Sequence, residues 1–412
     1  MSTKHDEFSE GALAGLRVLD LSRILAGPTC TQLMGDLGAD VIKIEKPGLG
    51  DETRAWGPPF VRDGEGEDTQ QSAYYLCCNR NKRSVAVDIS KPEGSALVRQ
   101  LAAHCDVFIE NFKVGGLAKY GLAYDDLKER SPGLVYCSIS GFGQTGPNAH
   151  RAGYDVMAQG YGGIMSLTGE PDGEPMKVAV GVADVMCGMY AATAILAAIR
   201  HRDRSGEGQY IDLGLVDTQI AWLINEGANY LVSKQTPKRR GNQHPNIVPY
   251  QVFAVTDGYV IVAVGNDSQF TRFVELIGMP GLAEDERYRT NASRVVHRDE
   301  LVELIATRLR GMSKNEILDG MEARKIPGGP INTLPEVFDS EQAAARGMRI
   351  SMPHPQSGDG TVDLIGNPLK LSRTPVSYRR SPPTCGADTE DTIREILGEQ
   401  ALADARTSGV LG

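Results

Sequence analysis

The chain has 412 residues, of which 41% are hydrophobic and 23% are charged, a composition typical of soluble globular proteins. This length predicts two domains, or one large domain with a substantial insertion. The formal net charge of −10 argues against nucleic acid as a partner.

The sequence has no feature that predicts secretion, a membrane span or a metal site. Its first residues are polar and acidic, unlike a signal or transit peptide, and no apolar run of about eighteen residues is free of charge. The seven cysteines include no C-x-x-C pair, which favours reduced, buried thiols. We therefore expect a cytoplasmic protein without membrane contact, without a metal and without a permanently bound cofactor.

Short apolar stretches alternate with helical patterns over the first part of the chain. We expect strands at 17–22, 41–45, 84–89, 106–112 and 134–139, and helices at 28–37 and 92–104. Apolar strands separated by helices indicate a doubly wound, Rossmann-like α/β fold, whose parallel sheet binds ligands beyond the carboxyl ends of its strands. Arg23–Pro28 stands where dinucleotide enzymes carry G-x-G-x-x-G, so a nicotinamide dehydrogenase is not expected.

Asp184 stands directly before an apolar stretch, Val185–Arg200, that predicts a helix buried on all sides. A carboxylate at the start of such a helix would face free backbone N–H groups and the positive helix end. Aspartate is a favoured N-cap residue, so capping is one interpretation. The other is a desolvated carboxylate that attacks an activated acyl group, and this segment alone does not exclude it.

The remaining sequence predicts a smaller domain inserted into the large one. A strand at 208–213 and a helix to about residue 232 precede a basic, proline-containing stretch at 234–247. A hairpin turning at Asp257-Gly258, two or three helices and a turn at 327–330 follow. From residue 340 a few strands lead to a charged helix that starts near Asp388. We assign 1–205 to a large Rossmann-like domain, 206–247 to a linker, 248–335 to a small α+β domain, and 336–412 to a return segment that completes the large domain.

Two basic clusters, at 79–84 and 238–240, are candidates for binding an anionic ligand in this acidic chain. Clusters of this kind are also common in solvated turns, so each has two interpretations. An anionic substrate would in either case need local positive charge.

Ordered motifs along the chain make it resemble the class III CoA-transferases from about residue 13 to its end. They are Gly15–Ser22, Ala26–Pro28, Gly38–Glu45, Asn81–Ser84, Glu110–Phe112, Gly141–Gly143, Gly153–Asp155, the Asp184 segment and Gly328–Pro330. Within the family, Gly50–Phe60, Ile247–Gln251 and Gly265–Phe270 look most like transferases that use succinyl-CoA and a dicarboxylate such as glutarate. The resemblance implies a large Rossmann-like domain, a small domain and two subunits interlocked as a homodimer.

The family's catalytic carboxylate falls on Asp184, so the resemblance favours the nucleophile over a plain cap. It implies that Asp184 attacks the succinyl-CoA thioester to give a mixed anhydride, and that an aspartyl-CoA thioester then reacts with the acceptor acid. CoA is therefore expected as part of a substrate. Its contacts fall by position on Leu25, Ala26, Lys46, Val87, Asp88, Ile89, Ser90, Asn111, Phe112, Lys119, Arg151, Tyr154 and Asp155.

The substrate side of the expected site is less closely defined. Gln243 and His244 fall in a glycine-containing loop that would contact substrate, and this loop or the backbone near Gly143 would supply N–H donors to the oxyanion. Plain loop structure is the alternative for His244. Arginine suits the second carboxylate of a dicarboxylic acceptor, and Arg23, Arg54 and Arg240 are the candidates.

Two other functions compete with CoA transfer. A 2-methylacyl-CoA racemase shares the fold, but that branch places a histidine where Tyr154 stands. Tyrosine, whose ordinary pKa is about 10, is a poor base at neutral pH. A non-catalytic CoA-binding protein is the second alternative, although every catalytic motif of the family is present.

Overall fold

The computed structural model describes residues 11–412, which form two compact units. The first, called here the sheet unit, takes in the described residues up to Ile164 together with Lys177–Leu223 and Glu341–Gly412. The second, called the helical unit, comprises Met165–Met176 and Ile224–Ser340. Residues 206–247, assigned above to a linker, carry one strand and two helices of these units.

A six-stranded parallel sheet forms the centre of the sheet unit, in the order β5-β2-β1-β6-β7-β8. Its strands are β1 (Arg17–Asp20), β2 (Asp40–Glu45), β5 (Lys82–Ala86), β6 (Val107–Glu110), β7 (Val135–Ser140) and β8 (Tyr210–Gly214). Nearly all side chains of the first five are buried, as expected for a parallel sheet covered on both faces, whereas the edge strand β8 is largely uncovered. The predicted parallel α/β sheet is confirmed. The strand order reverses between β1 and β6, the point at which doubly wound sheets bind ligands.

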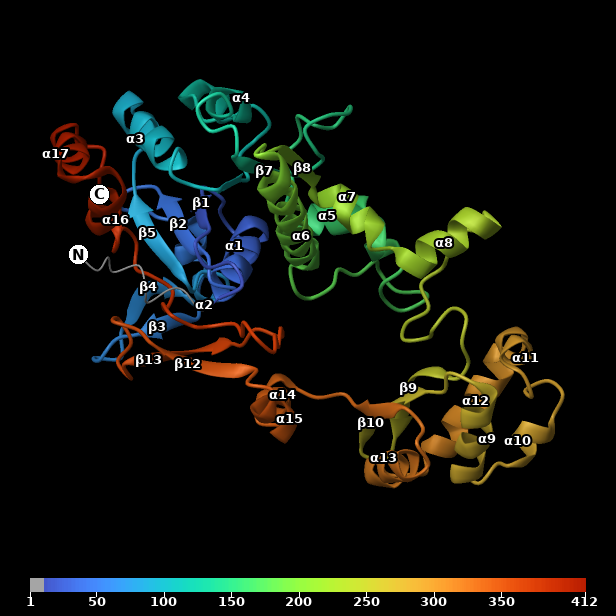
Figure 1. Cartoon of the computed structure of the whole chain (residues 1–412). Helices are drawn as coiled ribbons and strands as arrows, with labels where there is room; N and C mark the ends of the chain where they lie inside the picture. Colours follow the sequence, from blue (N-terminus) through green and yellow to red (C-terminus); the bar gives the residue numbers. More distant parts are fainter. Residues whose placement is uncertain (1–10) are drawn as a thin grey trace. The chain divides into compact units, whose positions relative to one another are not determined.

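Helices cover both faces of this sheet (Figure 1). The core on one face includes side chains of α1 (Ala26–Asp36), α5 (Asp155–Tyr161), α6 (Val182–Ser205) and α7 (Leu215–Ala221). The core on the other includes α3 (Pro92–Ala102), α4 (Tyr124–Leu127), α16 (Thr389–Leu397) and α17 (Glu399–Thr407). The chain therefore returns from the helical unit to complete the second face of the sheet.

Shorter elements flank the sheet, and of the two hairpins among them only the first lies where no strand was predicted. The hairpins are β3 (Phe60–Arg62) with β4 (Asp68–Ser72), and β12 (Arg349–Pro353) with β13 (Thr361–Ile365). The short helices are η2 (Glu52–Ala55), α2 (Ala73–Leu76), η3 (Ala118–Tyr120), η4 (Ile164–Ser166) and α15 (Glu341–Ala345). Asp68–Ser72 is polar throughout, so its sequence lacks the alternation by which a half-buried strand is recognised.

Helix α6 packs along α1 in the core of the sheet unit, but the prediction that it is buried on all sides is wrong. Met189, Tyr190 and Leu196 are exposed on its uncovered side. Within residues 11–412, α6 is the one helix long and apolar enough, by length and composition alone, to cross a membrane. A second copy of the chain could equally cover the exposed side of α6. The homodimer stays a prediction.

The helical unit has its own core, built on an antiparallel sheet of order β11-β10-β9. Its strands are β9 (Tyr250–Val255), β10 (Gly258–Ala263) and β11 (Gly328–Pro330). Its helices are α8 (Ile224–Ser233), α9 (Asp267–Leu276), α10 (Gly281–Glu284), α11 (Asn291–Val296), α12 (Arg298–Leu309), α13 (Lys314–Ala323) and α14 (Leu334–Phe338). The hairpin turn predicted at Asp257-Gly258 is confirmed, whereas the stretch predicted as a turn at 327–330 supplies strand β11.

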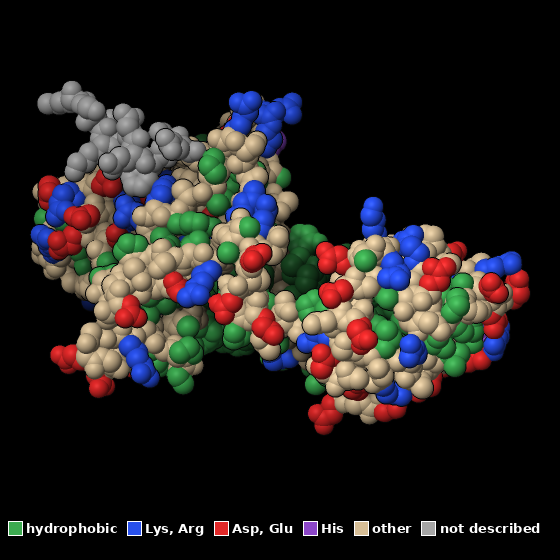
Figure 2. Space-filling view, turned by 90° about the horizontal axis from the view of Figure 1, so that it is seen from below, with side chains coloured by type: hydrophobic (Ala, Val, Ile, Leu, Met, Phe, Trp, Pro, Cys, Tyr) green, Lys and Arg blue, Asp and Glu red, His purple; other side chains and the backbone are tan. Residues whose placement is uncertain are grey.

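The surface mixes charges of both signs. Figure 2 shows acidic and basic side chains interspersed over one face, with hydrophobic side chains exposed between them. Exposed apolar residues are frequent on α8, where Tyr230, Leu231 and Val232 are uncovered. The negative net charge is therefore spread over the surface in that view.

Candidate active site

Two adjoining cavities lie beyond the carboxyl ends of the sheet strands, at the point where the strand order reverses. The strand-end cavity, of about 680 Å³, is lined by the loops that follow β1, β2, β5 and β6. The Asp184 cavity, of about 160 Å³, is lined by the loops after β1, β6 and β7 and by the start of α6. Arg23 and Phe112 line both, so the two cavities meet.

The structure brings together most of the residues predicted to contact CoA. Lys46, Val87, Asp88, Ile89, Ser90 and Phe112 line the strand-end cavity. Leu25, Ala26, Asn111, Phe112, Arg151 and Tyr154 line the Asp184 cavity. Lys119 lies at the edge of this group, with its ammonium nitrogen 4.6 Å from the centroid of the Tyr120 ring, which lines the strand-end cavity.

Asp184 is the third residue of α6 and is only 8% exposed. Burial, and secondarily the negative charge of Asp155, raise the pKa of Asp184 to about 7. Within the part of the chain that the structure describes, no donor forms a hydrogen bond to the Asp184 carboxylate. Such a carboxylate loses little by giving up its charge, because neither solvent nor hydrogen bonds stabilise the ionised form.

Asp155, not Asp184, caps α6. The Oδ1 atom of Asp155 accepts hydrogen bonds from the backbone N–H groups of Ala183, at 2.8 Å, and Asp184, at 3.3 Å. The N-cap position itself is Gly181, so the interpretation of Asp184 as the cap of its own helix is wrong. Asp155 does not line either cavity, and its role as a CoA contact is replaced here by that of a helix cap. The Asp184 side chain is thereby left free to face the cavity.

Close packing of α6 on α1 places Asp184 near a second helix N-terminus. A Cβ atom on Gly188 would lie 2.5 Å from the backbone oxygen of Ala26, so only glycine permits this approach. Helix α1 starts at Ala26 without a side-chain cap. Among the described residues, nothing accepts a hydrogen bond from the N–H groups of Ala26 and Gly27. The free N–H group of Ala26 therefore lies at the edge of the Asp184 cavity, and that of Gly27 is next to it in the chain.

The loop before α1 is held in an unusual backbone conformation. Ile24 has a φ angle of 70°, a region that β-branched residues rarely adopt. Its N–H group donates to both carboxylate oxygens of Asp51, at 3.3 and 3.2 Å. Asp51 in turn forms a fully buried ion pair with Lys43, at 2.9 Å. The buried pair thus fixes the backbone that presents Leu25 and Ala26 to the cavity.

Some predicted positions lie elsewhere. Gln243 and His244 belong to the helical unit, where the Nδ1 atom of His244 accepts a hydrogen bond from Asn246 and its backbone oxygen accepts one from Arg298. Arg54 is buried against Glu45, with Nη2 2.7 Å from Oε2, and lines neither cavity, so it is wrong as the acceptor's cation. Gly143 also lies outside the cavities, although Gly141 lines one.

The basic cluster at 79–84 is neither an anion site nor a solvated turn. Arg80 pairs with Asp36 at 2.5 Å, Lys82 pairs with Asp20 at 3.3 Å, and Arg83 pairs with Asp40, and all three basic side chains are buried. These charges hold β5 and the segment before it against α1 and the neighbouring strands. Both interpretations of the cluster are therefore wrong.

Sequence reasoning missed an aromatic pair beside the site. Burial, and then the charge of Asp184, raise the pKa of Tyr74 well above its ordinary value. Its ring packs edge-on against Trp56, with centroids 5.2 Å apart, and Trp56 lines the strand-end cavity. Tyr74 follows the unpredicted β3–β4 hairpin, and no local pattern marks it as a site residue.

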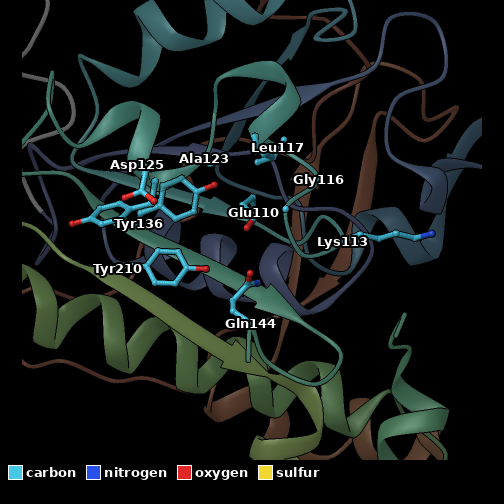
Figure 3. A pocket seen from close by; sticks show the side chains of 12 residues that line it. Glu110, Lys113, Gly116, Leu117, Ala123, Asp125, Tyr136, Gln144 and Tyr210 are labelled. Carbon is cyan, nitrogen blue, oxygen red and sulfur yellow. The ribbon is translucent and has the colours of Figure 1, made fainter. Parts of the chain in front are cut away.

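A further cavity, of about 400 Å³, is lined in part by the loop that follows β6 (Figure 3). Glu110 ends β6 and lines this cavity, and burial raises the pKa of Glu110 to about 7. Its carboxylate accepts hydrogen bonds from Ser138 and, at 2.7 Å, from the N–H group of Phe112. Glu110 therefore holds the backbone of Phe112, the residue that lines both cavities of the candidate site.

Comparisons with known proteins agree with this arrangement. The chain matches the model of CoA-transferase family III over residues 13–389. It is 50% identical over 385 residues to the succinate–glutarate CoA-transferase of Agrobacterium fabrum, covering 93% of this chain and 95% of that protein. It is 42% identical over 401 residues to the succinyl-CoA:glutarate CoA-transferase of Mus musculus, covering 97% and 90%. The crystal structure of a CAIB/BAIF family protein from Brucella suis matches with a TM-score of 0.82 and 48% identity, covering 94% of this chain and all of that one (100%).

Proposed function

Because the chain belongs to CoA-transferase family III and is an enzyme that transfers CoA, we propose that it moves CoA from succinyl-CoA to glutarate or a closely related dicarboxylate. The observation that carries the proposal is the buried carboxylate of Asp184, which accepts no hydrogen bond among the described residues and lines the Asp184 cavity, next to the strand-end cavity. The names of the relatives supply the two acids.

In the proposed reaction, Asp184 acts as the nucleophile. A carboxylate oxygen attacks the thioester carbonyl carbon of succinyl-CoA. The C–S bond breaks, CoA departs as the thiolate, and a succinyl–aspartyl anhydride is formed. The thiolate then attacks the aspartyl carbonyl carbon, which releases succinate and leaves an aspartyl-CoA thioester. Glutarate attacks that thioester to form the second anhydride and free the thiolate. Attack of the thiolate on the glutaryl carbon gives glutaryl-CoA and restores Asp184.

The environment of Asp184 suits each of these steps. Poor solvation of the carboxylate favours its conversion to a neutral anhydride or thioester. Each tetrahedral intermediate carries a negative oxygen, and the free N–H groups of Ala26 and Gly27 are the donors that we assign to it. Burial also limits access of water, which would hydrolyse an anhydride.

The strand-end cavity is proposed to hold the nucleotide part of CoA. Lys46 and Ser90 offer a cation and a hydroxyl for phosphate oxygens, and Arg23 lies where this cavity meets the other. The pantetheine arm would then run past Phe112 towards Asp184. Tyr154, which is 60% exposed, lines the Asp184 cavity and is placed to contact the thioester end of the acyl-CoA.

An acceptor screen tests the proposed function. The protein is mixed with succinyl-CoA and one carboxylic acid at a time, and the product thioesters are identified by mass spectrometry. We expect glutaryl-CoA to form fastest, with related dicarboxylates following. Transfer only to formate, oxalate or carnitine would contradict the assignment.

The acid limb of the pH profile should report the pKa of Asp184. Since the ionised form attacks, kcat/KM for succinyl-CoA should rise with pH and level off above about 7. In Asp155→Asn the amide oxygen still caps α6, but the neighbouring negative charge is gone, so the limb should move to lower pH. Burial is the larger cause of the raised pKa, so the pKa of Asp184 in this variant should remain above its ordinary value. An identical limb in both proteins would contradict this account of Asp184.

The racemase alternative is not favoured. The relatives named above are CoA-transferases, and Tyr154 stands at the position where a racemase of this fold would carry a histidine base. Deuterium incorporation from solvent into a 2-methylacyl-CoA, without any acceptor acid, would support racemase activity instead.

A further inference from the structure

Four basic side chains line the Asp184 cavity, and they differ in how far their charge is already compensated. They are Arg23, Lys113, His150 and Arg151. Arg23 forms an ion pair with Glu52, and its guanidinium lies 5.1 Å from the centroid of the Phe112 ring. Its charge is therefore shared with a carboxylate of the neighbouring strand-end cavity.

Arg151 is held in place without any carboxylate partner. Its guanidinium carbon lies 5.0 Å from the centroid of the Phe142 ring and 5.9 Å from that of Tyr161. The two rings themselves pack edge to face, 5.0 Å apart. Across residues 11–412, no aspartate or glutamate forms an ion pair with Arg151. The guanidinium is thus oriented by two aromatic faces while its charge remains available.

The loop that carries Arg151 is anchored on both sides. A Cβ atom on Gly153 would lie 2.2 Å from the Cα atom of Gly141, so the ends of the loop can cross this closely only as glycines. Within the loop, the N–H group of Arg151 donates to the oxygen of Asn148 at 2.9 Å, and the Asn148 amide donates to the Tyr161 hydroxyl at 3.0 Å. Arg151 is therefore an exposed cation without a carboxylate partner, on an anchored loop that lines the same cavity as Asp184.

We propose that Arg151, which the family resemblance places among the CoA contacts, instead binds the distal carboxylate of the dicarboxylic acids, an inference that rests on the proposed function. While one end of succinate or glutarate reacts at Asp184, the other end stays ionised in the same cavity and needs a positive partner. The planar guanidinium offers two parallel N–H groups to a carboxylate. Both the donor and the acceptor carry such a distal carboxylate, so one subsite serves both halves of the reaction.

Comparing glutarate with pentanoate as acceptors tests whether Arg151 binds the distal carboxylate, because the two acids have the same chain length and only glutarate has a second carboxylate. In Arg151→Gln we expect kcat/KM for glutarate to fall about 10- to 100-fold, the loss typical of a hydrogen bond to a charged group. For pentanoate, kcat/KM of the variant should stay within about twofold of that of the unaltered protein. Arg151→Lys, which keeps the charge but not the fork, should recover part of the loss. Arg130→Gln, an exposed arginine outside both cavities, is the matched control and should change neither.

Two further readouts decide the inference. The dissociation constant of CoA should be unchanged in Arg151→Gln; a weaker constant, with equal losses for glutarate and pentanoate, would show that Arg151 binds CoA and would overturn the inference. Binding of glutarate to the CoA-bound protein is measured by calorimetry and should be lost in Arg151→Gln. If the unaltered protein transfers CoA to neither acid, the proposed function fails, and the calorimetric comparison still decides the role of Arg151.

Discussion

Asp184→Asn should abolish CoA transfer and make the folded protein more stable above about pH 7. Asparagine has nearly the shape of aspartate but cannot form the anhydride, so kcat should fall by at least about 10⁴-fold, as when other covalent nucleophiles are removed. The measurement is the rate of glutaryl-CoA formation from succinyl-CoA and glutarate.

The gain in stability follows from the raised pKa of Asp184, about 7 in the folded protein against an ordinary value of 3.8. Between these values the folded protein holds a proton that the unfolded chain has lost, so stability falls as pH rises, and the full penalty is reached above about pH 7. Asparagine avoids this penalty. We expect a gain in the free energy of unfolding of about 2–4 kcal/mol at high pH, and none below about pH 4.

Asp203→Asn is the control for this experiment, because Asp203 lies near the other end of α6 and pairs with Arg202 at the surface. This substitution should not alter turnover, and it should change the free energy of unfolding by no more than about 1 kcal/mol. Asp184→Asn should still bind CoA. Retained turnover in that variant would contradict a covalent role for Asp184.

Asp36→Ala should produce the largest loss of stability. The Asp36 carboxylate accepts hydrogen bonds from Arg80, at 2.9 and 2.5 Å, and from the amides of Asn81 and Asn367, each at 2.8 Å. It therefore joins α1 to the segment before β5 and to the returning C-terminal residues. Removal leaves the Arg80 charge buried and unpaired, at a cost of about 3–5 kcal/mol.

Urea denaturation measures this loss, and Asp36→Asn is used if the alanine variant does not fold. The control is Asp125→Ala, which removes an exposed ion pair with Lys128 and should cost about 0–1 kcal/mol. Equal midpoints for the Asp36 and Asp125 variants would contradict the role given to the buried carboxylate.

The sheet was predictable from the sequence because its strands carry their own signal. Val107–Glu110 and Val135–Ser140 are short, largely apolar stretches bounded by helical patterns, and burial on both faces requires that composition. The β3–β4 hairpin was not predictable, since β4 is polar and its pairing with β3 is irregular. Exposure of one side of α6 was also hidden, because apolar composition does not say what covers a helix.

The site was predictable to the extent that family motifs mark single positions. They placed Asp184, Ala26 and Phe112 at the cavities. Interactions between distant segments were hidden: the cap of α6 comes from Asp155, 29 residues before Asp184. Arg80 likewise finds Asp36, 44 residues away, which turns an apparent surface charge into a buried one. Charge patterns along a sequence do not reveal such partners.

Trapping the covalent intermediate tests the central claim most directly. The protein is mixed with succinyl-CoA without an acceptor, quenched in acid, digested and analysed by peptide mass spectrometry. A CoA thioester should be found on the peptide that contains Asp184, and it should disappear when glutarate is added before the quench. A CoA adduct on another residue, or continued turnover without any adduct on Asp184, would contradict the account.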